Sequence, residues 1–234
     1  ALEPDPLDPS KYVLAVGGTA SNDVMYVSYS SSTGQILILV NGGMSYRANY
    51  DVADLAQIAI YGAAGRDLMR ASASVPVPVL LHGGDGNDVL CGGTAGSVLV
   101  GGKGNDALHG SSGREVLIGG LGSDTLDGQG NQDLLIGGTT DHDLDVAALE
   151  RVMAEWQRTD KSLNLRVGHL KDGTIGGLNG AVRLNPTTVH DDATVDYLLG
   201  GSGSDWYFNT PSTASIRDVY STIGMDEWVT YYLL

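Results

Sequence analysis

Carboxylates recur every eighteen residues in the middle of this 234-residue sequence. Asp88, Asp106 and Asp124 each close a glycine-rich hexapeptide, and these hexapeptides read GGDGND, GGKGND and GGLGSD. Ser97 and Glu115 stand at the half-period between them. Carboxylate and turn carbonyl oxygens are hard ligands, which suit Ca²⁺ well. The spacing therefore predicts a row of calcium sites, provided that the fold stacks these turns.

A shorter period of nine residues indicates which fold does so. From Gly83 the chain reads GGDGNDVLC, GGTAGSVLV, GGKGNDALH, GSSGREVLI, GGLGSDTLD and GQGNQDLLI. The eighth residue of every nonapeptide is a leucine: Leu90, Leu99, Leu108, Leu117, Leu126 and Leu135. This spacing fits neither a straight helix nor one long strand, but it fits a solenoid in which each nonapeptide is a turn and a short strand. Glycine supplies the positive φ of the turn, and strand alternation points the leucine inward.

Two nonapeptides complete one coil, so alternate turns fall on opposite sides. We call 83–88, 101–106 and 119–124 the odd turns, and 92–97, 110–115 and 128–133 the even turns. Stacking places the carboxylates of the odd turns about 4.8 Å apart, and their repulsion favours cations between them. The even turns carry Ser97 and Glu115, and Arg114 adds a positive charge. We therefore expect little metal on the even side, except where Asp133 stacks on Asp205.

The pattern closely resembles the RTX, or hemolysin-type, calcium-binding nonapeptide GGxGxDxUx, over residues 83–136 and again over 200–208, GGSGSDWYF. The resemblance implies a parallel β-roll in which aspartates and turn carbonyls of two stacked turns share each of several Ca²⁺ ions. The motif departs at Ser97 and Glu115, so ligands are not carried over to them. The expected metal-binding residues are Asp67, Gly83, Gly84, Asp85, Gly86, Asp88, Gly101, Gly102, Lys103, Gly104, Asp106, Gly119, Gly120, Leu121, Gly122, Asp124, Asp133, Asp196 and Asp205.

The pattern divides the chain into five segments within one all-β fold. We expect a linker or processed end at 1–12, an N-terminal β-rich segment leading into the solenoid at 13–79, the RTX β-roll at 80–138, a helix-containing insert at 139–195, and final repeats with a C-terminal cap at 196–234. The proline-rich start suggests the linker. Asp67, in YGAAGRDLM, is expected to end a degenerate odd turn. The alternating stretches 17–29 and 33–43 predict a hairpin or an early coil that caps the open end of the sheet.

The seventh repeat starts at Gly137 and resumes only at Asp196. We therefore interpret the intervening residues as a loop spliced into one turn. Within it, Leu149, Val152, Met153 and Trp156 have helical spacing, with Val146 extending the stripe and Asp143 or Asp145 as the N-cap. The outward positions of the even strands are apolar as well: Val98, Val100, Val116, Ile118, Leu134 and Ile136. A sheet that is apolar on both faces is normally covered, so we expect the helix to pack there.

Composition excludes several classes of function. A net charge of −15 disfavours nucleic acid and anionic membranes as partners. Cys91 is the only cysteine, which excludes an internal disulfide. No run is apolar enough to span a membrane, and no signal peptide is visible.

HExxH, GxSxG and Cys-His arrangements are absent, and no catalytic residue is assigned. His190, Asp191 and Asp192 form the one polar cluster of interest, interpreted as a loop beside the split turn.

These observations favour a secreted calcium-binding β-roll module that folds when it binds Ca²⁺ and forms part of a larger extracellular protein. Two alternatives stay open. One is a carbohydrate-active β-solenoid enzyme of the lyase or epimerase type, which would act on an extracellular polysaccharide. The other is a surface-layer or adhesion building block that self-associates through its ends.

Overall fold

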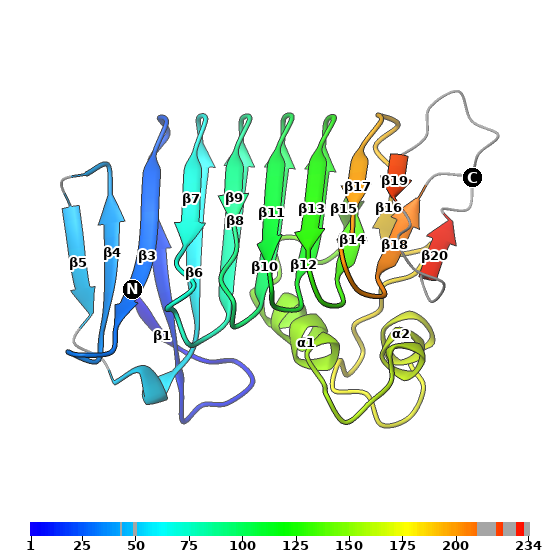
Figure 1. Cartoon of the computed structure of the whole chain (residues 1–234), viewed down its shortest axis with the longest axis horizontal. Helices are drawn as coiled ribbons and strands as arrows, with labels where there is room; N and C mark the ends of the chain where they lie inside the picture. Colours follow the sequence, from blue (N-terminus) through cyan, green and yellow to red (C-terminus); the bar gives the residue numbers. More distant parts are fainter. Residues whose placement is uncertain (43, 49–50, 210–218, 222–227, 232–234) are drawn as a thin grey trace.

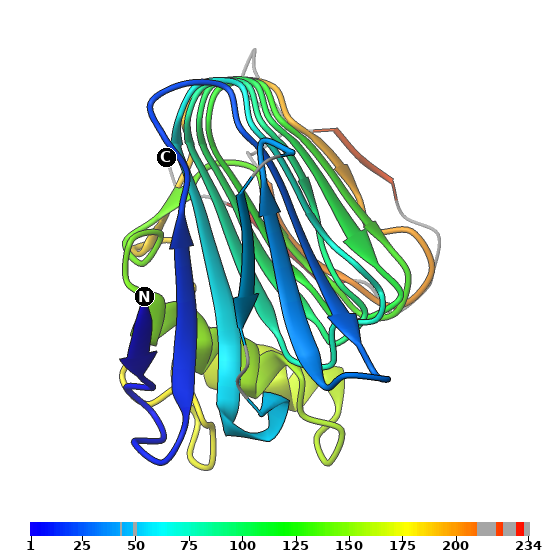
Figure 2. The ribbon, with the colours of Figure 1, turned by 90° about the vertical axis from the view of Figure 1, so that its left-hand side faces the viewer.

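The computed structural model describes residues 1–42, 44–48, 51–209, 219–221 and 228–231. Within them the chain coils into two facing sheets, and the stacked coils superimpose when viewed along the coil axis (Figures 1 and 2). In spatial order, sheet A contains β1 (Leu2–Pro4), β2 (Tyr12–Gly17), β6 (Leu55–Ala64), β8 (Val79–Asp85), β10 (Ser97–Lys103), β12 (Val116–Leu121), β14 (Leu134–Ile136), β18 (Trp206–Asn209) and β20 (Trp228–Tyr231). Sheet B contains β19 (Val219–Ser221), β17 (Tyr197–Leu199), β13 (Thr125–Gln129), β11 (Ala107–Ser111), β9 (Val89–Cys91), β7 (Leu68–Ala71), β3 (Val24–Ser30), β4 (Gln35–Val40) and β5 (Met44–Ala48). This arrangement is the expected parallel β-roll.

The register of the sheets follows the eighteen-residue period. Parallel pairing aligns Leu90 with Leu108 and Leu126 in sheet B, and Leu99 with Leu117 and Leu135 in sheet A. All six leucines have no exposed surface and form the interior between the sheets. The prediction that position eight points inward is therefore confirmed. The odd turns run from sheet A to sheet B, and the even turns run back.

Glycine is required in the odd turns because of backbone shape and close stacking. Gly84, Gly86, Gly102 and Gly104 all have positive φ. A Cβ on Gly104 would lie 2.0 Å from the carbonyl oxygen of Gly86, one coil away. No side chain fits in that space, so each turn can stack directly on its neighbour.

The N-terminal segment forms both an early coil of the solenoid and a hairpin, the two structures that its alternating pattern suggested. β2 pairs in parallel with β6, and β3 pairs in parallel with β7, so this segment already forms a coil. β3 and β4 then form an antiparallel hairpin, which β5 extends at the edge of sheet B. The 3₁₀ turn η1 (Val52–Asp54) leads back into sheet A.

Residues 1–12, expected to be a linker or a processed end, pair with sheet A in the structure. β1 pairs antiparallel with β2, and Asp5 is buried. The terminal amine of Ala1 also donates to the carbonyl oxygen of Ala15, at 2.6 Å. The physical reason is that β2 would otherwise present its unpaired backbone groups at the edge of sheet A.

The insert lies on the outer face of sheet A (Figure 1). α1 (Val146–Trp156) is the predicted helix, and Asp145 caps it by accepting from the Ala148 N–H. Asp143 instead accepts from Thr140. The apolar side of α1 packs with the outward residues of sheet A, as expected: Val98, Val100, Val116, Ile118, Leu134 and Ile136. A second helix, α2 (Leu163–Asp172), was not predicted, because its sequence has no clear amphipathic stripe.

The insert leaves the coil intact. β15 (Thr139–Thr140) and β16 (Val189–His190) pair antiparallel at its base. The interrupted repeat then resumes, with β17 on β13 and β18 on β14. Part of the expected C-terminal cap lies outside the described residues. Neither of the described helices has the length and apolar character of a membrane span.

Candidate functional site

The aspartates of the odd turns form a continuous hydrogen-bonded row. One carboxylate oxygen, Oδ1, of each aspartate accepts the backbone N–H of the aspartate one coil earlier. Asp88 accepts from Asp67, Asp106 from Asp88 and Asp124 from Asp106, each at 2.7 Å, and Asp196 accepts from Asp124 at 2.8 Å. The sequence prediction that these five residues stack is thereby confirmed, including the 21-residue step at Asp67.

The second oxygen, Oδ2, has no such partner in most of the row. The Oδ2 atoms of Asp67, Asp88, Asp106 and Asp124 are buried and receive no hydrogen bond from any residue that the structure describes. All four residues are almost completely buried. A buried carboxylate oxygen without a donor or a cation is strongly unfavourable. In the described part of the chain, no basic side chain forms an ion pair with any of these four aspartates.

The space beside each Oδ2 is bordered by a second oxygen. A Cβ built on Gly101 would lie closer than 3.0 Å to both Asp106 Oδ2 and the carbonyl oxygen of Gly119. The first glycines of the neighbouring turns, Gly83 and Gly119, show the same pattern. A carboxylate oxygen and carbonyl oxygens from two turns are the donor set that Ca²⁺ prefers. In the described residues no three His, Cys, Asp or Glu side chains gather into one group, so backbone carbonyls must supply many of the ligands.

Burial dominates the electrostatics of the row. It raises the pKa of Asp88 to about 6, of Asp106 to about 7 and of Asp124 to about 9. A hydrogen bond from the preceding aspartate N–H opposes each shift, and the charge of the preceding aspartate adds to it. These side chains resist ionisation until a cation compensates them.

The third residue of each odd turn, which is Asp85, Lys103 or Leu121, contributes only backbone atoms to the row. The side chains of Lys103 and Asp85 point to solvent and form an ion pair at 2.9 Å. Leu121 is 45 % exposed. The carbonyl oxygen of Lys103 accepts from Gly86 N–H, and that of Leu121 accepts from Gly104 N–H. Of the expected site residues, these three side chains are therefore not brought into the row.

Asp23 extends the row by one rung that we did not predict. Its N–H donates to Asp67 Oδ1 at 2.7 Å, as in the other rungs. Its own oxygens, however, accept from Thr19 and Asn41. Burial acts to raise its pKa, but these hydrogen bonds outweigh it and the pKa is lowered. The missed signal was GGTASND, in which Asp23 is the sixth residue counted from Gly18.

The even row is less uniform. The Ser97 hydroxyl is fully hydrogen-bonded within its own turn, because it accepts from Gly93 N–H and donates to the Gly93 carbonyl oxygen. Asp133 N–H donates to Asp205 Oδ1 at 2.8 Å, which confirms the predicted stacking of these two aspartates. Glu115 N–H donates to Asp133 Oδ1 at 2.9 Å in the same manner.

Arg114 does not place its charge in the even row, contrary to expectation. Its guanidinium donates to the carbonyl oxygens of Gln157 and Arg158, just after α1, at 3.3 and 2.8 Å. The last carbonyls of a helix lack intrahelical donors and carry partial negative charge, which attracts the guanidinium outward. Gln157 also donates to Ala95 O, and Trp156 Nε1 donates to Gln132 O. The end of α1 is thus bonded to all three even turns.

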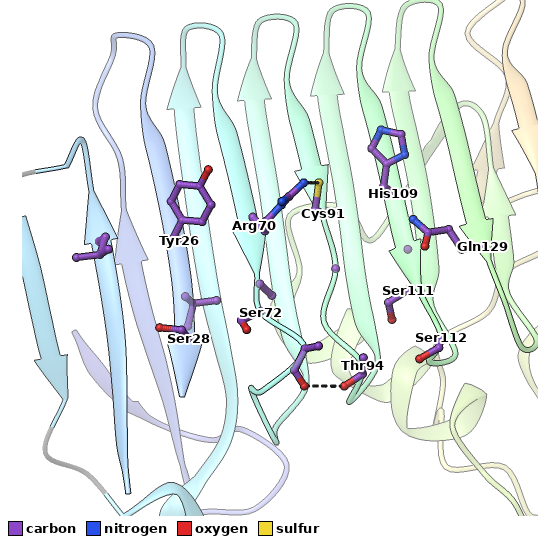
Figure 3. Close-up of a pocket in the computed structure, with 16 residues that line it drawn as sticks. Tyr26, Ser28, Arg70, Ser72, Cys91, Thr94, His109, Ser111, Ser112 and Gln129 are labelled. Atoms are coloured by element: carbon purple, nitrogen blue, oxygen red, sulfur yellow. Dashed lines mark hydrogen bonds between the residues drawn. The ribbon is translucent and has the colours of Figure 1, made fainter. Parts of the chain in front are cut away.

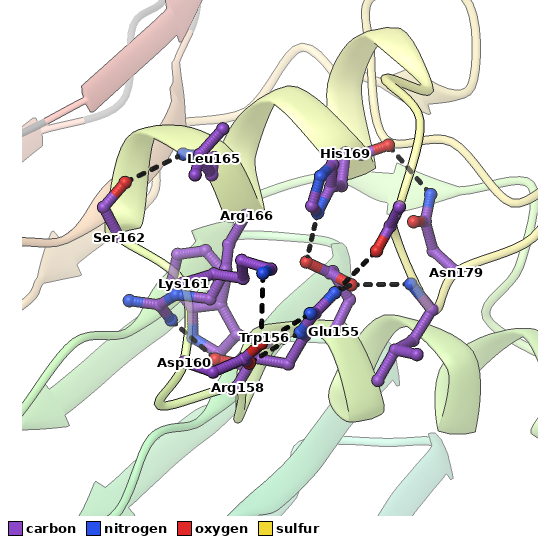
Figure 4. Close-up of polar contacts among 12 residues, drawn as sticks. Glu155, Trp156, Arg158, Asp160, Lys161, Ser162, Leu165, Arg166, His169 and Asn179 are labelled. Carbon is purple, nitrogen blue, oxygen red and sulfur yellow. Dashed lines mark hydrogen bonds and ion pairs between the residues drawn. The ribbon is translucent and has the colours of Figure 1, made fainter.

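The insert is held together by its own polar contacts (Figure 4). Glu155 is fully buried and accepts from Leu178 N–H at 2.6 Å, while its other oxygen lies 2.5 Å from His169 Nδ1. At the end of the insert, Asp192 accepts from Gly122 N–H at 2.6 Å, and His190 lies 2.7 Å from Asp141. The polar cluster around His190 therefore contains a contact that ties the insert to an odd turn.

The outer face of sheet B carries a groove of about 1040 Å³ (Figure 3). Tyr26, Arg70, Cys91 and His109 come from successive strands, and Gln129 lies farther along. The Arg70 guanidinium donates to Cys91 Sγ at 3.8 Å. The strand register makes Cys91 and His109 neighbours, although the sequence alone showed no Cys-His arrangement.

Comparison with known proteins supports calcium as the metal. The model of the RTX calcium-binding nonapeptide repeat matches four copies, at residues 80–99, 92–126 and 109–141. No curated protein and no solved structure matched the chain. The matched residues include the three odd turns with their unpartnered aspartate oxygens. Residues 80–141 are therefore RTX calcium-binding nonapeptide repeats, and the chain contains a calcium-binding β-roll.

Proposed function

We propose that Ca²⁺ ions lie between successive odd turns and make the β-roll fold. The observation that carries this proposal is the buried, donor-free Oδ2 atom of Asp67, Asp88, Asp106 and Asp124. Each ion would bind Oδ2 together with turn carbonyls, such as that of Gly119 beside Asp106. Asp196 continues the stacking in the odd row, and the pair Asp133 and Asp205 repeats it in the even row, through the same bond from a backbone N–H to Oδ1.

We further propose that the module is secreted and folds outside the cell, as part of a larger protein. The stacked sites do not exist in the unfolded chain, so the free energy of calcium binding becomes free energy of folding. A chain of net charge −15 would remain extended where calcium is scarce and become compact where it is abundant.

Replacement of Asp106 tests the proposed stacking. Asp106 lies between two complete odd turns, so Asp106→Ala should weaken or remove two ions. Asp88→Ala and Asp124→Ala should have smaller effects, because Asp88 borders the degenerate turn of Asp67 and Asp124 borders the split turn. Isothermal calorimetry counts the ions. Asp127→Ala is the matched control, because Asp127 points outward from sheet B. An unchanged number of ions in Asp106→Ala would contradict the stacking.

The raised pKa values predict opposite pH dependences with and without calcium. The pKa values of Asp106 and Asp124, about 7 and about 9, exceed the ordinary 3.8. The metal-free fold therefore holds protons that the unfolded chain releases. The stability from these groups is complete below about pH 4 and is lost as pH rises through the folded pKa values. With calcium bound, protons compete with the ion and acid destabilises.

Melting temperatures measured between about pH 5.5 and pH 8 check this prediction. In excess chelator the melting temperature should rise by several degrees toward the acid end. At calcium near its dissociation constant it should fall toward the same end. The same direction in both series would show that calcium and protons do not share these carboxylates.

Two finer functions remain alternatives. The groove on sheet B supports binding of an extracellular polysaccharide, since an aromatic ring and a guanidinium, Tyr26 and Arg70, lie side by side in it. Activity on uronate polymers would favour the enzyme alternative. Calcium-dependent self-association, followed by light scattering, would favour the adhesion alternative.

A further inference from the structure

The outer face of sheet B presents four chemically active side chains in one in-register row. Parallel pairing aligns Arg70 on β7 with Cys91 on β9, and Cys91 with His109 on β11. Asp127 on β13 continues the row beside His109. A guanidinium, a thiol, an imidazole and a carboxylate therefore follow one another at the spacing of neighbouring strands, about 4.8 Å. The first three of them line the groove on sheet B (Figure 3).

Arg70 gives this groove a positive charge that no carboxylate neutralises. Its exposed guanidinium donates to Cys91 Sγ at 3.8 Å, and it forms no ion pair with any residue that the structure describes. Among the described residues that line the groove, none is acidic, although the whole chain has 28 acidic and 13 basic residues. The groove is therefore a surface that can receive an anion on a strongly acidic protein.

The neighbours of Cys91 on both sides favour reaction of its thiol. A cation beside a thiol stabilises the thiolate, which is the nucleophilic form. His109, on the next strand, can accept the thiol proton directly or through one water. The imidazolium formed in this way is compensated by Asp127, whose Oδ2 atom lies 3.8 Å from His109 Nδ1. The row thus places a nucleophile, a proton acceptor and a compensating carboxylate in order.

The thiol is also open to a ligand. Cys91 is half-buried and borders a groove of about 1040 Å³. At the equivalent ninth position of the even repeats, Val100 and Ile118 are almost completely buried, because the insert covers sheet A. Ser72, Ser111 and Gln129 add hydroxyl and amide groups along the groove (Figure 3). A small polar anion can therefore reach Cys91 from solvent.

We propose that Cys91 exchanges with small anionic disulfides and so holds a carboxylate-bearing thiol compound in the groove as a mixed disulfide. The Cys91 thiolate attacks one sulfur of the disulfide, an S–S bond to Cys91 forms, and the original S–S bond breaks. The departing thiolate takes up the proton that His109 accepted. The number of disulfides is conserved, so no further oxidant is needed. The Arg70 guanidinium binds the carboxylate of the half that stays.

Mass spectrometry of the full chain in saturating calcium tests this proposal, because Cys91 is the only cysteine and every disulfide adduct reports on it. Three reagents of similar size differ in charge: dithiodiglycolate is anionic, hydroxyethyl disulfide is neutral and cystamine is cationic. Each rate is divided by the rate of the same chain unfolded in urea and chelator, which removes the intrinsic reactivity of the reagent.

This ratio should be highest for dithiodiglycolate. The net charge of −15 would by itself favour cystamine, so the local and the overall charge predict opposite orders. A highest ratio for either of the other reagents, or a folded chain that reacts with none of them, would overturn the proposal. So would a disulfide-linked pair of chains as the main product on a non-reducing gel. These measurements use the wild type and do not depend on the folding of a variant.

Two variants separate the charge from the proton transfer. Arg70→Gln should slow the reaction with dithiodiglycolate about tenfold, and the reaction with hydroxyethyl disulfide less. His109→Gln should slow all three reactions about tenfold near pH 7 and match the wild type above about pH 9, where a thiol ionises without a base. Unchanged rates in Arg70→Gln, or a loss in His109→Gln that persists at high pH, would contradict these roles.

Two further variants are controls. Arg151→Gln removes the same charge from α1, which covers the other sheet, and should keep the wild-type rates. Cys91→Ser should form no adduct but should bind as many calcium ions as the wild type in calorimetry. The failure of the thiol site and the failure of calcium binding are therefore separate results.

Discussion

Excess chelator should unfold the β-roll or lower its melting temperature by tens of degrees. The cause is the buried carboxylates of Asp67, Asp88, Asp106 and Asp124, whose Oδ2 atoms receive no hydrogen bond from the described residues. With free calcium about a hundredfold above the dissociation constant, each site adds about 3 kcal/mol to the free energy of unfolding. A few such sites contribute about as much as the whole net stability of an ordinary domain, which is about 5–15 kcal/mol.

Circular dichroism during thermal melting, with and without chelator, measures this effect. Chelator already saturated with calcium is the control for effects of the chelator itself. Added Mg²⁺ should restore less stability than added Ca²⁺, because Mg²⁺ demands short and nearly octahedral coordination. Superimposable melting curves in excess chelator and in excess calcium would contradict calcium-dependent folding.

Trp156→Asp should make the protein aggregate even in saturating calcium. Trp156 is fully buried between the insert and sheet A, in one cluster with Val100, Ile118 and Ile136. Its ring packs on Trp206, at 6.1 Å between centroids, and Arg166 lies over its face at 4.8 Å. Loss of a buried tryptophan costs about 3–5 kcal/mol, and a buried charge adds to that cost. Release of the insert would expose a large apolar sheet face.

Light scattering and size-exclusion chromatography in calcium check this result. Leu165→Asp is the matched control, because Leu165 lies on α2 in the same insert but is 50 % exposed. Trp156→Phe should behave between the two, since it retains part of the apolar packing but loses ring volume and the hydrogen bond from Nε1 to Gln132 O. A monodisperse Trp156→Asp protein with the melting temperature of the control would show that the insert does not protect sheet A.

The amino-acid sequence was sufficient for the coil and for most of the odd row. In a solenoid every coil has nearly the same length, so separation along the sequence converts directly into position in space. That is why Asp88, Asp106 and Asp124 stack as their spacing predicts, and why the inward leucines align. The strand alternation likewise revealed the apolar outer face of sheet A and the helix that covers it.

The tertiary structure decided those side-chain contacts that do not follow the repeat period. Asp23 joins the row across 44 residues, because a hairpin intervenes before the next coil. Arg114 leaves its row because carbonyl acceptors at the end of α1 attract it, and those lie 43 and 44 residues away. Glu115 faces the next coil because its longer side chain brings Oε2 to the same space that the Gly128 carbonyl borders. Such contacts depend on where side chains end in space, which a one-dimensional period cannot specify.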